Sequence, residues 1–242
     1  MRSFLLLAGG LVIGLAGGWI AGHTTPTPAS PVPAAAPSSG SAPCAAGITQ
    51  VDPWTLRGEK NLYNGYPAKN PDGTINVVVE IPAGTNAKWE VTADGLMKLE
   101  LRNGAPRTVN YLPYPGNYGM IPNTKLPKEQ GGDGDALDVL VLGPTLPRGS
   151  VVAARPIGVM RFLDKGEQDD KVLAVMDHTP LAGARSLADL DRVAPGAADI
   201  LLRWFNNYKG PGKMDFRGWG EADEAVALLD RAAAAAGGST RD

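Results

Sequence analysis

Asp133, Asp135 and Asp138 place three carboxylates within six residues, with Gly134 in the turn and the apolar run 139–142 directly after them. Carboxylates this close repel one another at neutral pH unless a cation compensates their charge. Because oxygen is the only donor that they offer, a hard divalent cation such as Mg2+ or Ca2+ fits them better than zinc or copper. Taken alone, the motif is equally compatible with an acidic turn at the protein surface.

Further polar side chains stand at unusual places in the elements predicted around them. Glu80 interrupts an apolar strand, and Lys88 and Glu90 share one face of another strand. The remaining members of the set are Arg107, Tyr114, Tyr118, Asp164, Asp169, Lys171, Tyr208 and Lys209. Each residue alone has an ordinary explanation, such as a sheet edge, an ion pair or a solvated turn. Together, seven carboxylates with several basic and tyrosine side chains suit a polyanionic substrate held through several metal ions.

Transfer of a phosphoryl group to water is the chemistry that this set suits. The reaction needs neutralised charge on the phosphate oxygens, a positioned nucleophile and an in-line geometry. Clustered metal ions supply both the phosphate clamp and a nucleophilic hydroxide at neutral pH. The residues therefore favour a metal-dependent hydrolase.

Short strands separated by Gly and Pro dominate the first two thirds of the predicted domain. The strands are expected at 75–81, 88–91, 96–101, 138–142, 150–155, 158–162 and 171–176, with a hairpin turn at 93–95. Residues 111–119 form an aromatic loop rich in Pro and Gly, and helices are expected at 198–209 and 221–236. Many short strands followed by helices predict a closed or nearly closed β-barrel with helices packed outside.

The chain resembles the family I soluble inorganic pyrophosphatases over residues 75–220. The family signature Asp-Gly-Asp-Pro-x-Asp-Val-Leu-Val appears as residues 133–141. Other matching segments are Glu80-Ile81-Pro82, Lys88-Trp89-Glu90, Tyr114-Pro115-Gly116-Asn117-Tyr118-Gly119, the spacing of Asp164, Asp169 and Lys171, and Tyr208-Lys209. The resemblance implies an α+β, mainly β fold: an OB-like closed five-stranded β-barrel with additional strands and two C-terminal helices outside.

The same resemblance implies Mg-dependent hydrolysis of inorganic pyrophosphate to two phosphates by a metal-activated water. Asp135 would be the catalytic base, and the metal ligands would be Asp133, Asp138, Asp164, Asp169 and Glu90. The phosphates would be bound by Lys88, Arg107, Tyr118, Tyr208 and Lys209, with support from Glu80, Tyr114 and Lys171. Several Mg2+ ions per site are implied, with Mn2+ or Zn2+ as substitutes, as is a homo-oligomer, a hexamer in bacterial members.

Two departures from the family pattern stand out. Ala136 replaces the usual Pro of the signature, which loosens the turn but removes no ligand. The substrate arginine is either Arg107 or Arg102. Compared with the family spacing, Arg107 is one residue too close to Tyr114, whereas Arg102 would require an insertion of four residues. The smaller change favours Arg107.

Two other functions are compatible with parts of the sequence. One is an exported module that binds divalent cations, although an EF-hand fails because its positions five, six and twelve, counted from Asp133, would be Leu137, Asp138 and Pro144. The other is hydrolysis of a different phosphoanhydride on the same fold.

The chain divides into three expected parts. Residues 1–23 read as a signal peptide or membrane anchor, with 4–22 as the only segment expected to contact a membrane. Residues 24–47, rich in Pro, Ala and Ser, read as a disordered linker, and residues 48–242 as the catalytic domain. This predicts an exported protein, either periplasmic or anchored in the inner membrane and facing the periplasm.

Composition excludes several other classes. The net charge of −2 leaves no broad basic surface for nucleic acid. The single cysteine, Cys44, excludes an intrachain disulfide and a cysteine-based zinc site, and two histidines are too few for a His-rich metal site.

Overall fold

The largest sheet of the protein is seven-stranded, in a computed structural model that describes residues 43–238. Its strands are β3 (Ile75–Ile81), β8 (Asn117–Met120), β9 (Asp138–Leu142), β10 (Val151–Asp164), β11 (Glu167–Gln168), β12 (Lys171–Val175) and β13 (Met214–Glu221). The pairings run β10-β12-β9-β8-β3, and β3 pairs with β10 in turn, so the order of pairing returns to its first strand. β9 and β12 are parallel, whereas the other pairs are antiparallel.

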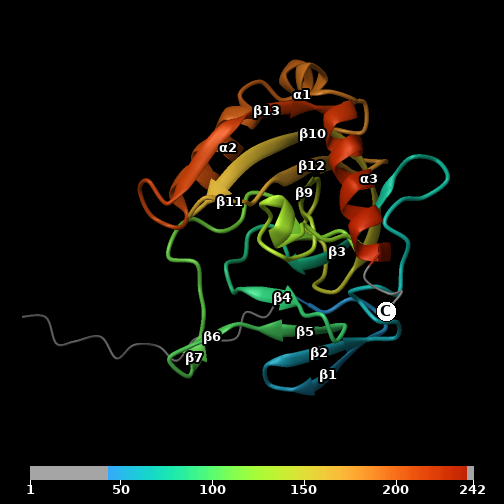
Figure 1. The fold of residues 1–242 in the computed structure, drawn as a ribbon, viewed down its shortest axis with the longest axis vertical. Helices are drawn as coiled ribbons and strands as arrows, with labels where there is room; N and C mark the ends of the chain where they lie inside the picture. Colours follow the sequence, from blue (N-terminus) through green and yellow to red (C-terminus); the bar gives the residue numbers. More distant parts are fainter. Residues whose placement is uncertain (1–42, 239–242) are drawn as a thin grey trace, which may run out of the picture. The chain divides into compact units, whose positions relative to one another are not determined.

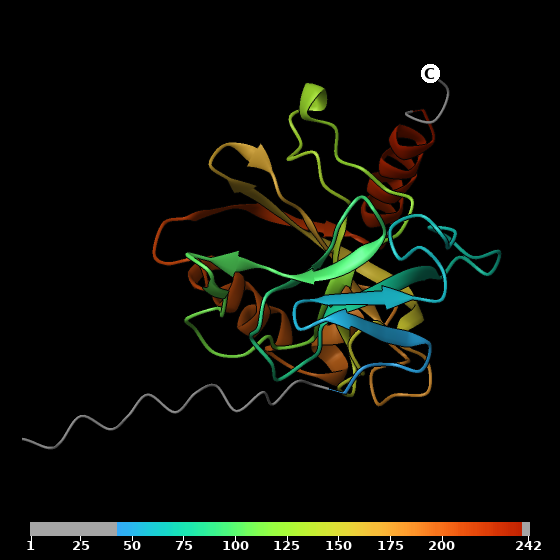
Figure 2. The ribbon, with the colours of Figure 1, turned by 90° about the horizontal axis from the view of Figure 1, so that it is seen from below.

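A second, four-stranded sheet has the order β1-β2-β5-β4 and lies beside β3 (Figures 1 and 2). It consists of β1 (Ile48–Asp52), β2 (Thr55–Gly58), β4 (Trp89–Val91) and β5 (Leu96–Leu99). A small hairpin of β6 (Leu101–Arg102) and β7 (Ala105–Pro106) follows β5. The hairpin predicted around 93–95 is therefore present, and it carries Glu90.

Three helices come after β12 in the chain: α1 (Leu187–Val193), α2 (Ala197–Asn207) and α3 (Ala222–Gly238). A short 3-10 helix, η1 (Lys128–Gln130), precedes β9. The two predicted helices correspond to α2 and α3. A third helix, α1, is also present and was not predicted. α1 has seven residues and buries only Leu190, which is too short for a periodic apolar pattern to reveal it.

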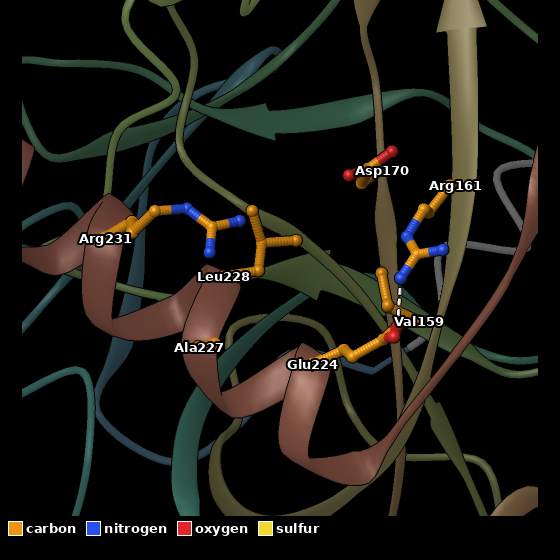
Figure 3. Close-up of a pocket in the computed structure, with 7 residues that line it drawn as sticks. All are labelled: Val159, Arg161, Asp170, Glu224, Ala227, Leu228 and Arg231. Atoms are coloured by element: carbon orange, nitrogen blue, oxygen red, sulfur yellow. Dashed lines mark hydrogen bonds and ion pairs between the residues drawn. The ribbon is translucent and has the colours of Figure 1, made fainter.

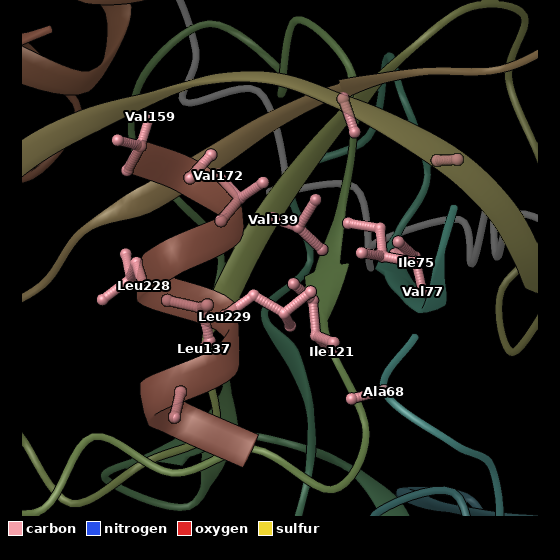
Figure 4. Close-up of a cluster of buried hydrophobic side chains, with 14 of the residues drawn as sticks. Ala68, Ile75, Val77, Ile121, Leu137, Val139, Val159, Val172, Leu228 and Leu229 are labelled. Atoms are coloured by element: carbon pink, nitrogen blue, oxygen red, sulfur yellow. The ribbon is translucent and has the colours of Figure 1, made fainter. Parts of the chain in front are cut away.

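The central strands are buried on both faces, which explains their continuous apolar sequence. Side chains of a strand alternate between its two faces, so Val139 and Val172 join the core under α3, where they lie near Leu228 and Leu229 (Figure 4). On the other face, the core contains Leu140, Leu173, Phe162, Trp204 and Phe205, the last two from α2. The sheet is thus held between α3 and α2, and its strand ends are free to carry polar groups.

Several strands differ from the predictions. Residues 117–120, expected in a loop, form β8, where Gly119 passes so close to β3 that a Cβ would lie 1.9 Å from the Val78 carbonyl oxygen. The segments 150–155 and 158–162 form one strand, β10, which continues through an irregularity between Pro156 and Gly158. β1, β2 and β13 were not predicted, because their short or Gly-containing sequences carry no clear alternation.

The predicted signal or anchor, residues 1–23, and most of the predicted linker lie outside the described residues. The last linker residues belong to the folded unit, since the Ala45 amide donates to the Arg148 carbonyl at 2.8 Å. Between residues 43 and 238 no helix has the length and apolar character needed to cross a membrane.

Candidate active site

Asp138 lies at the centre of a polar cluster at the ends of three neighbouring strands. It begins β9 and is the register partner of Lys171, which begins β12. The Tyr118 hydroxyl, from β8, donates to Asp138 Oδ2 at 2.5 Å, and Lys171 Nζ lies 2.6 Å from the same oxygen. Lys171 is fully buried and also pairs with Asp169. The strand register therefore brings together Tyr118, Asp138 and the Asp169–Lys171 pair, which come from three separate stretches of the sequence.

Lys209 extends this cluster from the end of α2. Its Nζ lies 2.8 Å from Asp164 Oδ2 and 3.3 Å from Asp169 Oδ2. Burial would raise the pKa of Asp169, but the ammonium groups of Lys171 and Lys209 hold it below its ordinary value. Asp169 is consequently ionised and lies between two lysines.

Glu80, Lys88 and Glu90 form the neighbouring part of the site, on β3 and on the segment that enters β4. Lys88 Nζ pairs with Glu90 Oε1 at 2.8 Å and lies 5.3 Å from the centroid of the Tyr118 ring. Burial raises the pKa of Glu80 to about 8, against the opposing effects of Lys88 and of a 2.6 Å hydrogen bond from the Val91 amide. Burial would lower the pKa of Lys88, but the groups around it, Tyr114 and Glu90 foremost, raise it well above its usual value.

Asp133 and Asp135 lie on the turn before β9. Burial, and then the charges of Asp138, Asp135 and Asp169, raise the pKa of Asp133 to about 6, although the Asp135 amide donates to its carboxylate at 3.0 Å. Partial burial and the charges of Asp138 and Glu90 likewise raise the pKa of Asp135. Neither carboxylate has an ion pair with any residue between 43 and 238. Both are therefore short of positive charge.

An aromatic wall closes one side of the cluster. Tyr114 packs against Tyr118 and Trp204, with ring centroids 5.0 and 4.5 Å apart, and Tyr208 stacks on Trp204 at 4.7 Å. The Tyr114 hydroxyl is buried and has no hydrogen-bond partner in the described part of the chain. Burial, only partly offset by Lys88, raises the pKa of Tyr114 above its normal value, so this hydroxyl stays protonated.

The two candidate arginines are placed differently. Arg107 is half-buried and pairs with Glu100. Burial of Glu90 would raise the pKa of its carboxyl, but the charges of Lys88 and then Arg107 lower this pKa. Arg102 is exposed on the small β6-β7 hairpin. Proximity to Glu90 thus favours Arg107 as the arginine of the site.

The donor chemistry of the cluster fits a divalent cation. Its seven carboxylates (Glu80, Glu90, Asp133, Asp135, Asp138, Asp164, Asp169) outnumber its four cationic side chains, Lys88, Arg107, Lys171 and Lys209. Among residues 43–238 no three His, Cys, Asp or Glu side chains converge on one point, and the lysines instead lie between the carboxylates. Oxygen donors with excess negative charge suit Mg2+.

One cavity of the fold lies outside this cluster. A cavity of about 240 Å³ between β10 and α3 is lined by Val159, Arg161, Asp170, Glu224, Ala227, Leu228 and Arg231 (Figure 3). None of the predicted site residues lines it.

Comparison with known proteins identifies the family of this chain. The family described as "Inorganic pyrophosphatase" matches residues 77–236. The chain belongs to the inorganic pyrophosphatase family. It is 38% identical over 172 residues to an inorganic pyrophosphatase of a Nostoc species, an alignment that covers 68% of this chain and 93% of the relative. A mouse inorganic pyrophosphatase is 34% identical over 176 residues, 64% of this chain and 61% of that protein.

Solved structures give the same family likeness. The type I inorganic pyrophosphatase from Toxoplasma gondii superposes with a TM-score of 0.72 at 27% identity, covering 78% of this chain and 96% of that one. The sequence of this chain predicted a mainly β fold with few helices, and this prediction is confirmed.

Sequence reasoning missed two residues that contact the site. Lys128, from η1, packs its side chain beside Gly134, and its charge opposes the raised pKa of Asp135. Arg148 lies behind Glu80 and Trp89. Neither belongs to a recognisable motif, so only the folded arrangement reveals them.

Proposed function

We propose that this protein hydrolyses inorganic pyrophosphate to two phosphates and that the cluster around Asp138 is its active site. The observation that carries the proposal is the continuous chain of contacts from Tyr118 through Asp138, Lys171, Asp169 and Lys209 to Asp164, in a member of the inorganic pyrophosphatase family. It unites carboxylates for metals with cations and hydroxyls for phosphate.

The carboxylates are the metal-binding part of this proposal. Mg2+ would be held by Asp133, Asp138, Asp164, Asp169 and Glu90. When bound, Mg2+ neutralises charge on the phosphate oxygens and acidifies water. The raised pKa of Asp133 supports this assignment, as does the lack of an ion pair at Asp133 or Asp135 among residues 43–238, because a divalent ion would compensate the charge of both carboxylates.

The basic and phenolic side chains would bind the two phosphates: Lys88, Arg107, Tyr118, Tyr208 and Lys209. Their hydrogen-bond donors match phosphate oxygens, and the charged ones stabilise the charge that develops as the bridging P–O bond breaks. Lys171, Glu80 and Tyr114 support them by fixing Asp138, β4 and the aromatic wall.

Asp135 would act as the general base. Its carboxylate is accessible on the turn before β9, close enough to Asp138 and Glu90 for their charges to raise its pKa. It would accept the proton from the attacking water, and the departing phosphate would carry away the bridging oxygen.

Finer features are proposed on the same grounds. The returning order of strand pairing supports an OB-like closed barrel of β3, β8, β9, β10 and β12. The family suggests a homo-oligomer, a hexamer in bacterial members. The apolar 4–22 segment and the Pro-rich stretch after it support export, with a domain tethered or released in the periplasm.

Phosphate release from pyrophosphate by the purified protein tests the function. With Mg2+ we expect two phosphates per pyrophosphate, and slower release from tripolyphosphate and ATP; Mn2+ and Zn2+ should substitute in part. Faster release from another phosphoanhydride would transfer the proposal to that substrate. No release from any of them with any of the three metals would leave only a cation-binding module.

A further inference from the structure

Arg148 is a buried cation on the loop between β9 and β10. Only 2% of the residue is exposed, its Nε donates to the Glu80 carbonyl oxygen at 3.0 Å, and its guanidinium carbon lies 4.9 Å from the centroid of the Trp89 ring. Within the described part of the chain it has no ion pair with a carboxylate. Its partners are therefore a backbone carbonyl and an aromatic face.

This burial of an unpaired charge lowers the stability of the fold, so stability does not explain it. Burying a charge without a counter-ion is unfavourable, and burial accordingly lowers the pKa of Arg148 to about 10. An apolar side chain of similar length would fill the same space without this cost. The position of the guanidinium thus calls for an explanation in terms of what it contacts.

Both contacts of Arg148 lead to the candidate active site. Trp89 lies between Lys88, which would bind phosphate, and Glu90, which would bind metal, and only 7% of Trp89 is exposed. The carbonyl that Arg148 holds belongs to Glu80, whose own carboxylate accepts from the Val91 amide at 2.6 Å. Arg148 therefore connects β3 to the segment 88–91 from behind, on the side away from the charged groups.

Hydrogen bonds fix the backbone of Arg148, and this limits the positions that its guanidinium can take. Its amide donates to the Pro43 carbonyl at 2.9 Å, and its carbonyl accepts from the Ala45 amide at 2.8 Å. The next amide, of Gly149, donates to the Val79 carbonyl at 2.8 Å. Two backbone and two side-chain interactions thus converge on Arg148, which lies outside the motifs that matched the family.

We propose that Arg148 is a positioning residue that sets the placement of Lys88 and Glu90 through the Trp89 ring and the Glu80 carbonyl. This inference rests on the proposed function, because it assigns a consequence to the placement of these two groups. The cation–π contact of Arg148 restrains the Trp89 ring. Loss of the guanidinium frees the ring and the segment that carries Lys88 and Glu90.

The test uses the full-length protein with Arg148→Met, Arg148→Lys and, as a matched control, Arg192→Gln on exposed α1. For Arg148→Met we expect the KM for Mg-pyrophosphate to rise about tenfold with a smaller change in kcat. Arg148→Lys should recover much of the loss, since it keeps a cation over Trp89, and the control should match the wild type. On a Trp89→Leu background, Arg148→Met should raise the KM little further.

Two outcomes would overturn the proposal: a lowered Tm of Arg148→Met with an unchanged KM, or equal losses in the Lys and Met variants. Binding of imidodiphosphate with Mg2+, measured by calorimetry, separates this inference from the function. If the wild type binds this analogue and Arg148→Met weakens binding about tenfold, the positioning role holds even without hydrolysis. If the wild type neither hydrolyses pyrophosphate nor binds the analogue, both proposals are wrong.

Discussion

Lys171 and Asp138 form the first rung of the parallel ladder between β12 and β9, and Lys171 Nζ lies 2.6 Å from Asp138 Oδ2. The same ammonium pairs with Asp169, two residues before it. One fully buried cation thereby compensates two carboxylates that would otherwise repel each other. We expect this charge balance to stabilise the end of the ladder.

Lys171→Met should therefore lower the free energy of unfolding. Breaking a buried ion pair by removing one partner typically costs about 3–5 kcal/mol, and we expect this range in EDTA. Mg2+ should restore part of the loss, because it compensates the same carboxylates. Urea unfolding followed by tryptophan fluorescence measures both values. Lys213→Met, at an exposed lysine, is the control; an equal loss in the two variants would contradict this role of Lys171.

Asp138→Asn should weaken metal binding directly. The substitution removes the charge of a proposed ligand and one of the two acceptor oxygens of this side chain, so half-maximal activity should require at least about tenfold more Mg2+. A Mg2+ titration of phosphate release measures this shift. Asp215→Asn, at an exposed ion pair with Arg217, should leave the titration unchanged. Loss of activity that no Mg2+ concentration recovers would argue against a ligand role.

Asp94 should make the hairpin before β5 sensitive to acid. Hydrogen bonds from Lys98 and Thr92 lower the pKa of this exposed carboxyl to about 2. Its folded pKa lies below the unfolded one, so its stabilisation is present above about pH 4 and is lost as the pH falls through 2. Asp94→Asn should cost less than about 1 kcal/mol at pH 6, since solvent screens the pair. The difference between wild type and variant should shrink from about pH 4 downwards and vanish below about pH 2, and a constant difference across this range would contradict the assignment.

The sequence predicted that the folded domain begins at Ile48, but we expect it to begin a few residues earlier. Removing residues 1–42 should leave activity and stability nearly unchanged, because every candidate site residue follows them. Removing residues 1–47 also deletes the two hydrogen bonds to the Arg148 backbone, which should cost about 1–3 kcal/mol. Urea unfolding of the two shortened proteins measures the difference. Identical stabilities would show that Pro43 and Ala45 contribute nothing.

The sequence predicted those strands in which the pattern of apolar residues matches the pattern of buried side chains. The alternation in β3 and the apolar run of β9 were recognisable because packing alone explains them. β8 was not, since Gly119 is required by the close approach of β3, a contact that exists only in the folded chain. Its Gly- and Pro-rich surroundings resemble a loop for that reason.

The composition of the candidate site was predicted better than its connections. The motifs identified Asp138, Lys171 and Lys209, but not that the lysines lie between the carboxylates, which depends on strand register and on the end of α2. Arg148 was missed altogether, because a single arginine in a Pro- and Gly-containing loop carries no sequence signal. Its importance comes from contacts to β3 and Trp89.

The effect of Asp135→Asn on turnover tests the mechanism most directly. Asn keeps the shape and one acceptor but cannot accept a proton, and a general base typically contributes about 10²- to 10⁴-fold to the rate. We expect kcat for Mg-pyrophosphate to fall by this factor while the far-UV circular dichroism, the Tm and the Mg2+ requirement stay near those of the wild type. Near-full activity of Asp135→Asn, alongside an active wild type, would contradict the account.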